Sequence, residues 1–304
     1  MRKSLKVLLA VVALVSTSCS GQPSSEQPSN EKNEYEPKIY ENSGKILYGL
    51  YPQTVVDDET TIMELNELTT TESNGWYLYE GTYYVKQVAD PDERSFKFSN
   101  GEYIEYGNTY WFKCEPIVWR ILANDNGEYF ILSEMLLDTH YYHNSIDDRT
   151  IYGETIYANN YEHSDIRAWL NNDFYNSAFS LNDEHILVTE VDNSASTTES
   201  SSNSFACDNT FDKVFLLSYQ DYKNSDYGFN SGSDRQAKLT DYALARCASQ
   251  YGEHGVYWTR SPAIPQFSNS GGYAWMIGQF NDLDDSYVYH DVYSVRPAIT
   301  LFIS

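Results

Sequence analysis

The hydrophobic pattern of the chain predicts strands first, then helices, then strands again. Residues 44–133 carry strand and tight-turn signals, in KILYGLY, WYLYEGTYYVKQV and TYWFKCEPIVWRILANDNGEYFILS. Within the last stretch, Asn126 and Gly127 separate two apolar runs, PIVWRIL and EYFILS. An Asn-Gly pair between such runs favours a two-residue hairpin turn. We therefore expect these two runs to be paired antiparallel strands.

The pattern changes to a helical period at residues 164–174, SDIRAWLNNDF. Ser164 suits a helix N-cap, and Asp165 favours the positive end of a helix. A further helical start is indicated near Ser180, and a second main helix is expected from Thr240 to Gly252. The apolar positions of the first helix would form one buried face: Ile166, Trp169, Leu170 and Phe174.

Strand signals return after residues 192–204, a polar low-complexity stretch that we expect to be a mobile loop. They occupy FDKVFLLS, GVYWTRSP, GGYAWMIGQF, DSYVYHD and SVRPAITLFIS. Strands that flank central helices argue for an α+β domain with a mostly antiparallel sheet and two main helices.

The N-terminus has the features of a secretory lipoprotein signal. Positive residues precede an apolar run that is too short to span a bilayer, and small residues then lead to Cys19. The segment STSC resembles a bacterial lipobox. This resemblance implies a signal peptide at residues 1–18 and a membrane anchor of palmitate type on the Cys19 thiol. Cleavage by the ordinary signal peptidase is the alternative.

The remaining chain divides into a tether and a domain. Residues 19–43 are rich in Ser, Gln, Pro, Asn and Glu, as expected of a disordered tether that holds the domain off the membrane. Residues 44–304 would form a single domain, with a β-rich insertion around 57–108. We expect it on the extracytoplasmic face of the cell membrane.

Charge and cysteine content limit the partners. The formal net charge of −24 repels nucleic acid, and it is compatible with cation binding or with solubility outside the cell. If Cys19 carries lipid, three cysteines remain and cannot all pair within one chain: Cys114, Cys207 and Cys247. Helical spacing indicates that Cys247 is a buried thiol, whereas Cys207 lies in a polar loop that could be exposed.

Seven phrases of the chain, in this order, resemble a bacterial domain family of unknown function, numbered 6273. They are LYGLYPQT, PIVWRIL, EYFILSEMLLD, SDIRAWLNNDFYNSAFS, DKVFLLS, YWTRSP and SVRPAITL. The resemblance covers about residues 44–304. The order of helix, WTRSP and SVRPA is similar to that of C-type-lectin-like domains, including the formylglycine-generating type. That likeness implies irregular loops that present a binding surface, although fold alone does not fix function.

The family phrases contain Arg167, Arg260 and Arg296. Guanidinium groups bind carboxylates through paired hydrogen bonds, so the three could form an anion clamp. In a chain with 44 acidic residues we favour a structural role, in which they pair with buried carboxylates or loop carbonyls. The other signature residues would be Trp169 and Leu170 in the core, Asn171 and Asn172 at loop contacts, and Pro297.

Two clusters contain residue types that bind metal ions. His140 and His143, with His163 nearby, lack the further ligands at known spacing that zinc requires, so solvated loop histidines are favoured. Calcium is a weak candidate cofactor at a run of carboxylates, Asp282, Asp284 and Asp285, with Asp291 further on. The EF-hand pattern fails there, and a charged turn is favoured.

The aromatic residues of the C-terminal third give the best functional signal. Some would serve the core, and the others could form a stacking surface for a glycan or a protein. The candidate ligand-binding residues are Tyr257, Trp258, Arg260, Trp275, Tyr287 and Tyr289, with Tyr273 and Tyr293 in the same crowd.

These observations predict a surface lipoprotein whose lectin-like domain binds an extracellular glycan or protein without catalysis. No G-x-S-x-G elbow, Ser-x-x-Lys set or phosphate-binding glycine loop is present in the sequence. The alternatives are an envelope enzyme, either a cysteine-dependent oxidase or a hydrolase, and a structural envelope protein.

Overall fold

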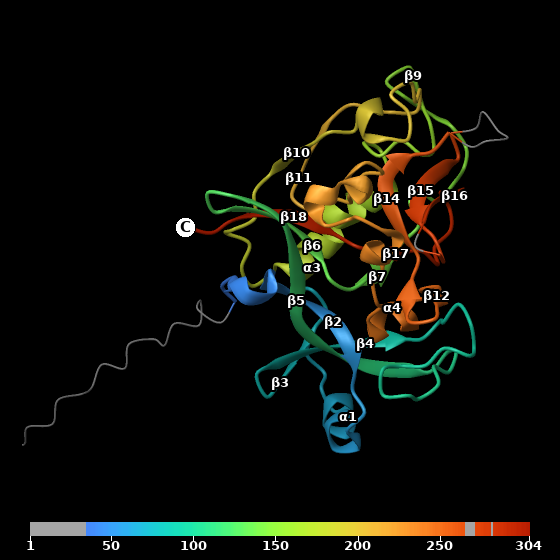
Figure 1. The fold of residues 1–304 in the computed structure, drawn as a ribbon. Helices are drawn as coiled ribbons and strands as arrows, with labels where there is room; N and C mark the ends of the chain where they lie inside the picture. Colours follow the sequence, from blue (N-terminus) through green and yellow to red (C-terminus); the bar gives the residue numbers. More distant parts are fainter. Residues whose placement is uncertain (1–34, 265–270, 281) are drawn as a thin grey trace, which may run out of the picture. The chain divides into compact units, whose positions relative to one another are not determined.

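β5 (Thr109–Asp125) is the strand around which the first of two main sheets is organised. The computed structural model describes residues 35–264, 271–280 and 282–304, and within these ranges the sheet has seven strands (Figure 1). The other six are β1 (Lys38–Tyr40), β2 (Lys45–Val55), β3 (Tyr77–Tyr79), β4 (Thr82–Val88), β6 (Glu128–Ser133) and β18 (Ala298–Phe302). β5 pairs in turn with β4, β2 and β6, always antiparallel, and β18 pairs with β6.

The predicted hairpin joins β5 to β6. Asn126 and Gly127 have φ angles of 51° and 92°, so both lie in the left-handed region that this type of two-residue turn requires. Asp125 and Glu128 pair directly across the turn. The prediction of two paired strands around Asn126-Gly127 is confirmed.

The second main sheet has five strands in the described ranges, and it comes largely from the C-terminal third. In spatial order they are β16 (Leu283–Tyr287), β15 (Tyr273–Ile277), β14 (Tyr257–Pro262), β17 (Ser294–Val295) and β7 (Asp138–Thr139). Only the contact of β14 with β17 is parallel. Short two-stranded ladders complete the β-structure: β8 (Arg149–Ile151) with β9 (Glu154–Ile156), β10 (Thr189–Val191) with β11 (Thr210–Asp212), and β12 (Gln250–Tyr251) with β13 (His254–Gly255).

The central helix begins where the sequence predicts it. α2 (Asp165–Trp169) continues through a π-helical turn, η3 (Leu170–Phe174), into α3 (Tyr175–Ala178). The Ser164 hydroxyl accepts a hydrogen bond from the Arg167 amide at 3.2 Å, which is the expected N-cap. A π-helical turn has a wider spacing than an α-turn, and it is followed by further buried residues, Tyr175 and Ala178.

The other helical segments are short. α1 (Glu59–Asn66) lies in the predicted insertion, and α4 (Asp241–Ala245) follows Thr240, whose hydroxyl accepts from the Ala243 amide. The 3-10 turns are η2 (Glu41–Ser43), η4 (Ala195–Thr197), η5 (Asp221–Lys223), η6 (Ser225–Tyr227) and η7 (Gly232–Arg235). The predicted fold class, α+β with a mostly antiparallel sheet, is confirmed.

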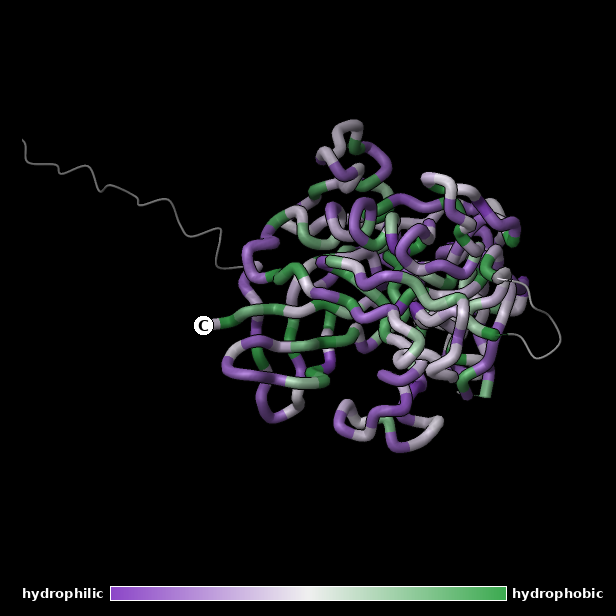
Figure 2. Tube along the Cα trace, turned by 90° about the horizontal axis from the view of Figure 1, so that it is seen from above, coloured by the Kyte–Doolittle hydropathy of each residue, from purple (hydrophilic) through white to green (hydrophobic). Residues whose placement is uncertain are grey.

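One hydrophobic core joins both sheets and the central helix. Trp119 of β5, Phe174 of η3 and Trp258 of β14 are all buried within it. Figure 2 shows hydrophobic stretches along the sheet strands and hydrophilic stretches in the outer loops. In the described part of the chain, no helix has the length and apolar character needed to cross a bilayer.

Several predicted elements differ in the structure. The helix from Thr240 stops at Ala245, because Cys247 has a φ of 81° and the chain then turns into the β12–β13 ladder. Residues 180–185 form no helix. The stretch 192–204, expected to be a mobile loop, is packed instead, with Asn193, Thr198 and Asn203 buried.

The N-terminal predictions lie mostly outside the described residues. These are the signal peptide at 1–18, the lipid on Cys19 and most of the tether. Residues 35–43, assigned to the tether, form β1 and η2 and belong to the unit Tyr35–Ser304. The reason is strand pairing, since Lys38–Tyr40 adds an edge to β2.

Candidate functional site

The outward face of β15 and β16 carries a set of partly exposed rings. Side chains alternate between the two faces of a strand, and Ala274 and Met276 of β15 are buried against the core. Tyr273 and Trp275 therefore point outward. Tyr273 pairs with Tyr287 across the two strands, which places their rings on the same face.

These rings and two neighbours form two groups of contacting rings, which share one face because Tyr273 and Trp275 lie two positions apart on β15. The centroids of Tyr273 and Tyr287 are 4.3 Å apart, and Tyr287 stacks on Tyr289 at 5.4 Å. At the other end, Tyr219 contacts Trp275 at 4.7 Å. Such distances are typical of interacting aromatic pairs. We call these five residues, Tyr219, Trp275, Tyr273, Tyr287 and Tyr289, the aromatic row.

The aromatic row also carries polar groups, some of which already form hydrogen bonds within the protein. The Trp275 indole N–H donates to Glu199 Oε2 at 2.9 Å, which fixes the ring. Burial, and then the charges of Asp284 and Glu199, raise the pKa of Asp285. A hydrogen bond with Tyr287 raises the pKa of Tyr273 to about 12, so the Tyr273 hydroxyl remains protonated at neutral pH.

Two predicted ligand-facing aromatics lie in the core instead. Tyr257 and Trp258 of β14 are completely buried, and the Trp258 indole donates to the His140 carbonyl at 3.0 Å. All six residues of β14 are buried, so neither face of this strand reaches solvent. The predicted binding role of these two residues is corrected to a structural one.

The three arginines are each held by protein groups. Arg167 Nη2 lies 2.7 Å from Asp212 Oδ1, and Arg260 Nη1 lies 2.8 Å from Asp221 Oδ2. Arg296 is buried and donates to the Ser133 carbonyl at 2.9 Å and to other oxygen acceptors. These contacts match the favoured structural reading. Arg260 was predicted to bind ligand together with the aromatic residues. It lies outside the aromatic row and pairs with Asp221, so this prediction is corrected.

The signature residues of the helix have the expected structural positions. Leu170 is buried and Trp169 packs against the core. The Asn171 side chain bonds both the carbonyl and the amide of Val214, whereas that of Asn172 bonds only Ala168 within the helix. Pro297 is buried, and its carbonyl accepts from the Ser133 amide.

The histidine and aspartate clusters do not converge on a metal geometry. Within residues 35–264, 271–280 and 282–304, no group of three or more His, Cys, Asp or Glu side chains is placed to hold an ion. His143 contacts Asp165 at 2.7 Å, and His140 and His163 bond other neighbours. Asp282 and Asp284 are exposed and Asp285 is half-buried.

A separate cavity of about 370 Å³ contains a thiol. His140, Arg246, Cys247 and Asp291 are among its lining residues. Burial, followed by the charges of Asp291 and two further aspartates, raises the pKa of Cys247 to about 11. The sulfur is therefore protonated at neutral pH, which is the opposite of what a nucleophilic cysteine needs. The three cysteines Cys114, Cys207 and Cys247 are all free.

Sequence reasoning missed Tyr219 and Glu199. Tyr219 follows the predicted strand FDKVFLLS, and Glu199 lies in the low-complexity stretch. Nothing local in the sequence connects them to β15, because the separation from Trp275 is long and only tertiary packing brings the three together.

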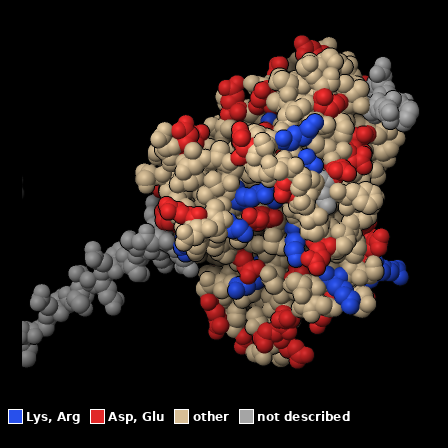
Figure 3. Space-filling view, in the orientation of Figure 1, with Lys and Arg blue, Asp and Glu red and all other residues tan. Residues whose placement is uncertain are grey.

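Acidic side chains are spread over the face seen in Figure 3 and are interspersed with basic ones.

The model of a family described as a domain of unknown function, DUF6273, matches residues 126–303. No curated protein and no solved structure matches the chain.

Proposed function

Since the chain belongs to the DUF6273 family, whose function is unknown, we propose a function on the basis of the aromatic row. The domain binds an extracellular glycan and does not convert it chemically. The proposal includes a lipid anchor on Cys19, an extracytoplasmic location and a C-type-lectin-like layout. The single observation that supports glycan binding is the row of outward rings on adjacent strands.

Sugar rings are suited to such a surface. The face of an aromatic ring carries partial negative charge, and the C–H groups of a pyranose carry partial positive charge. Sugar hydroxyls can then bond to the Tyr273 and Tyr287 hydroxyls and to the Asp285 carboxyl between the rings. The five rings of the row are only partly exposed, so they offer a small contact surface. Such a surface suits a narrow chain of sugars better than a protein partner, which typically covers about 800 Å² on each side of an interface.

The binding test is a glycan array and a panel of surface proteins, probed with the full chain. We expect a glycan ligand whose affinity falls at least about tenfold when Tyr287 and Tyr289 are both changed to Ala, since buried aromatic contacts dominate such interfaces. Tyr152→Ala is the control, because Tyr152 is fully exposed outside the row. Thermal melting should show that all variants fold.

The other outcomes distinguish the alternatives. Binding of a surface protein but no glycan would assign the row to a protein ligand. If a glycan binds the double variant as tightly as the unchanged chain, the aromatic row is not the site. If no ligand binds the folded chain, the structural envelope role replaces this proposal.

A further inference from the structure

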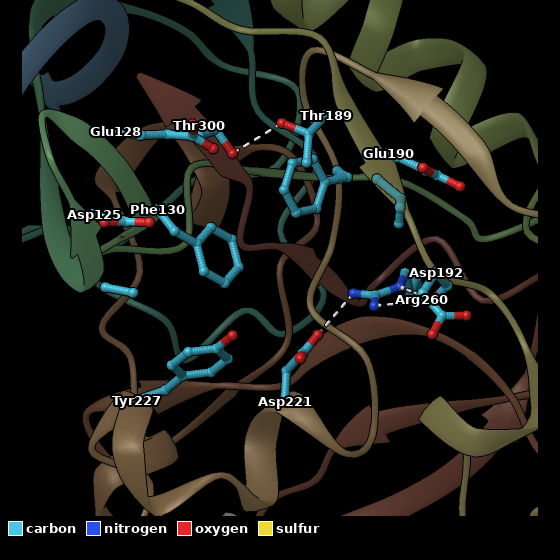
Figure 4. A pocket seen from close by; sticks show the side chains of 13 residues that line it. Asp125, Glu128, Phe130, Thr189, Glu190, Asp192, Asp221, Tyr227, Arg260 and Thr300 are labelled. Atoms are coloured by element: carbon cyan, nitrogen blue, oxygen red, sulfur yellow. Dashed lines mark hydrogen bonds and ion pairs between the residues drawn. The ribbon is translucent and has the colours of Figure 1, made fainter. Parts of the chain in front are cut away.

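A second cavity, of about 400 Å³, opens beside the first sheet and shares no residue with the aromatic row. One wall follows from strand register. Ala123 of β5, Phe130 of β6 and Thr300 of β18 are cross-strand partners and so share one face. Two positions along the chain from Ala123 and Phe130, Asp125 and Glu128 continue that face to the hairpin end. Figure 4 shows Asp125, Glu128, Phe130 and Thr300 among the side chains that line the cavity.

The inner wall of this cavity is aromatic. Phe130 stacks on Phe215 with a centroid distance of 5.8 Å and an interplanar angle of 18°. Tyr227 meets Phe130 nearly edge-on, at 5.4 Å and 78°. Phe130 and Tyr227 therefore present two walls at about a right angle, an arrangement that offers ring faces to a ligand.

The rim of the cavity is acidic and mostly uncompensated. It carries five carboxylates, from Asp125, Glu128, Glu190, Asp192 and Asp221. Arg260 is the one basic residue among the lining residues, and it pairs with Asp221 at 2.8 Å. Within the described ranges, no lysine or arginine side chain forms an ion pair with any of the other four carboxylates.

Arg260 is not available to an anion. Its Nη1 also donates to the Leu216 carbonyl at 2.8 Å, and its Nη2 donates to the Asp192 carbonyl at 3.1 Å. The guanidinium is buried, and its positive charge is balanced by the Asp221 carboxylate. An anionic ligand would therefore meet four carboxylates without a free cation to balance them.

We propose that this cavity binds an organic cation, an ammonium or guanidinium group at the end of a short alkyl chain. The alkyl part lies against Phe130 and Phe215, and the charged head faces Tyr227 and the carboxylates of Asp125 and Glu128. Aromatic faces and carboxylates both attract a cation, and the volume fits a side chain the size of lysine or arginine. This site is separate from the proposed glycan surface and does not depend on it.

The test uses the full chain and matched probes, followed by calorimetry and by NMR. n-Pentylammonium and 1-pentanol have similar shapes, but only the first is charged. We expect saturable binding of the ammonium at least about tenfold tighter than that of the alcohol, and weaker binding at high salt. Equal binding of the two probes, or no saturable ammonium binding, overturns the proposal.

Variants then locate the binding. Changing Asp125 to Asn and Glu128 to Gln together should weaken ammonium binding about fivefold or more, because both exposed carboxylates lie on the cavity face of the β5–β6 hairpin. The charge-matched control changes Glu67 and Glu102, exposed in the insertion, to Gln and should leave binding unchanged. Equal loss in both variants would mean a general effect of net charge and would overturn the assigned site.

Two further experiments test whether the cation is a protein side chain or a free amine, and whether the aromatic rings contribute to its binding. A short lysine-containing peptide that binds more tightly than n-pentylammonium identifies a protein side chain as the ligand, whereas equal affinity identifies a free amine. Phe130→Leu keeps an apolar wall but removes the ring face, so it should weaken the ammonium more than the alcohol. An unchanged ratio of the two affinities contradicts the aromatic part of the proposal.

Discussion

Asn171 uses the full hydrogen-bonding capacity of its side chain. Its Nδ2 donates to the carbonyls of Arg167 and Val214, and its Oδ1 accepts from the amides of Lys213 and Val214. One amide therefore joins the helix at the π-helical turn to the segment that enters the core at Val214. The role expected for Asn171 is confirmed, and Asn172 does not share it.

Asn171→Asp should destabilise the fold by about 2 kcal/mol, because two backbone carbonyls lose their donor and both then face a carboxylate oxygen. Chemical denaturation measures the change in the free energy of unfolding. Asn172→Asp is the control: this exposed side chain bonds only the Ala168 carbonyl, and we expect a loss below about 1 kcal/mol. Equal losses of unfolding free energy in the two variants would show that the hydrogen bonds between Asn171 and Val214 contribute little to stability.

At the scale of elements, α4 illustrates how backbone conformation can override a helical pattern. Leu244, Cys247, Ala248 and Tyr251 have helical spacing, yet only Leu244 lies in the helix. Cys247 occupies the left-handed region, and the Ala248 amide bonds back to the Ala243 carbonyl, which closes the helix end. Leu244 and Ala248 are buried, but Tyr251 is exposed and Cys247, predicted to be a buried thiol, is only partly buried. The burial of Ala248 comes from packing after the helix has ended.

Glycine is the residue that best tolerates the backbone conformation of Cys247. Cys247→Gly should therefore stabilise the fold by up to about 1 kcal/mol, which is a rise in Tm of about 2 °C for a chain of this size. Cys207→Gly is the contrasting variant, because Cys207 has no positive φ and packs against the core, so its Tm should fall. A similar fall in both variants would refute the strain at Cys247.

At the scale of the whole molecule, the unit Tyr35–Ser304 is larger than the matched family region. The match begins at residue 126, in the turn after β5, so β2 and β5 lie outside it. These strands supply buried residues of the shared core, among them Ile46 and Trp119. β6 depends on β5 as its neighbour on one side, and α3 and α4 both contact β2.

A fragment of residues 126–304 should consequently fail to fold cooperatively, whereas residues 35–304 should melt in a single transition. Loss of β2 and β5 exposes the apolar face of the central helix and an unpaired edge of β6. Circular dichroism melting and binding of a hydrophobic dye measure this difference. A cooperative melt of the shorter fragment, without dye binding, would contradict the dependence on β2 and β5.

Local signals in the sequence predicted several parts of the fold correctly. Asn126-Gly127 determined the β5–β6 turn, and Ser164 with the apolar spacing after it determined the start of the central helix. Each of these rests on interactions between residues close in the chain or on strand periodicity, which sequence patterns report directly.

By itself, then, the sequence determined the fold class, the main strands, the central helix and the resemblance to the family. The tertiary structure decided which aromatic residues reach solvent, since both faces of β14 are covered whereas β15 and β16 each keep one face partly exposed. It also decided the partners of Tyr219, Glu199 and Arg260, and it assembled the acidic cavity from β5, β6, β18 and the segment around β10. These features depend on strand order and long-range packing. Local sequence patterns do not show which residues far apart in the chain come into contact.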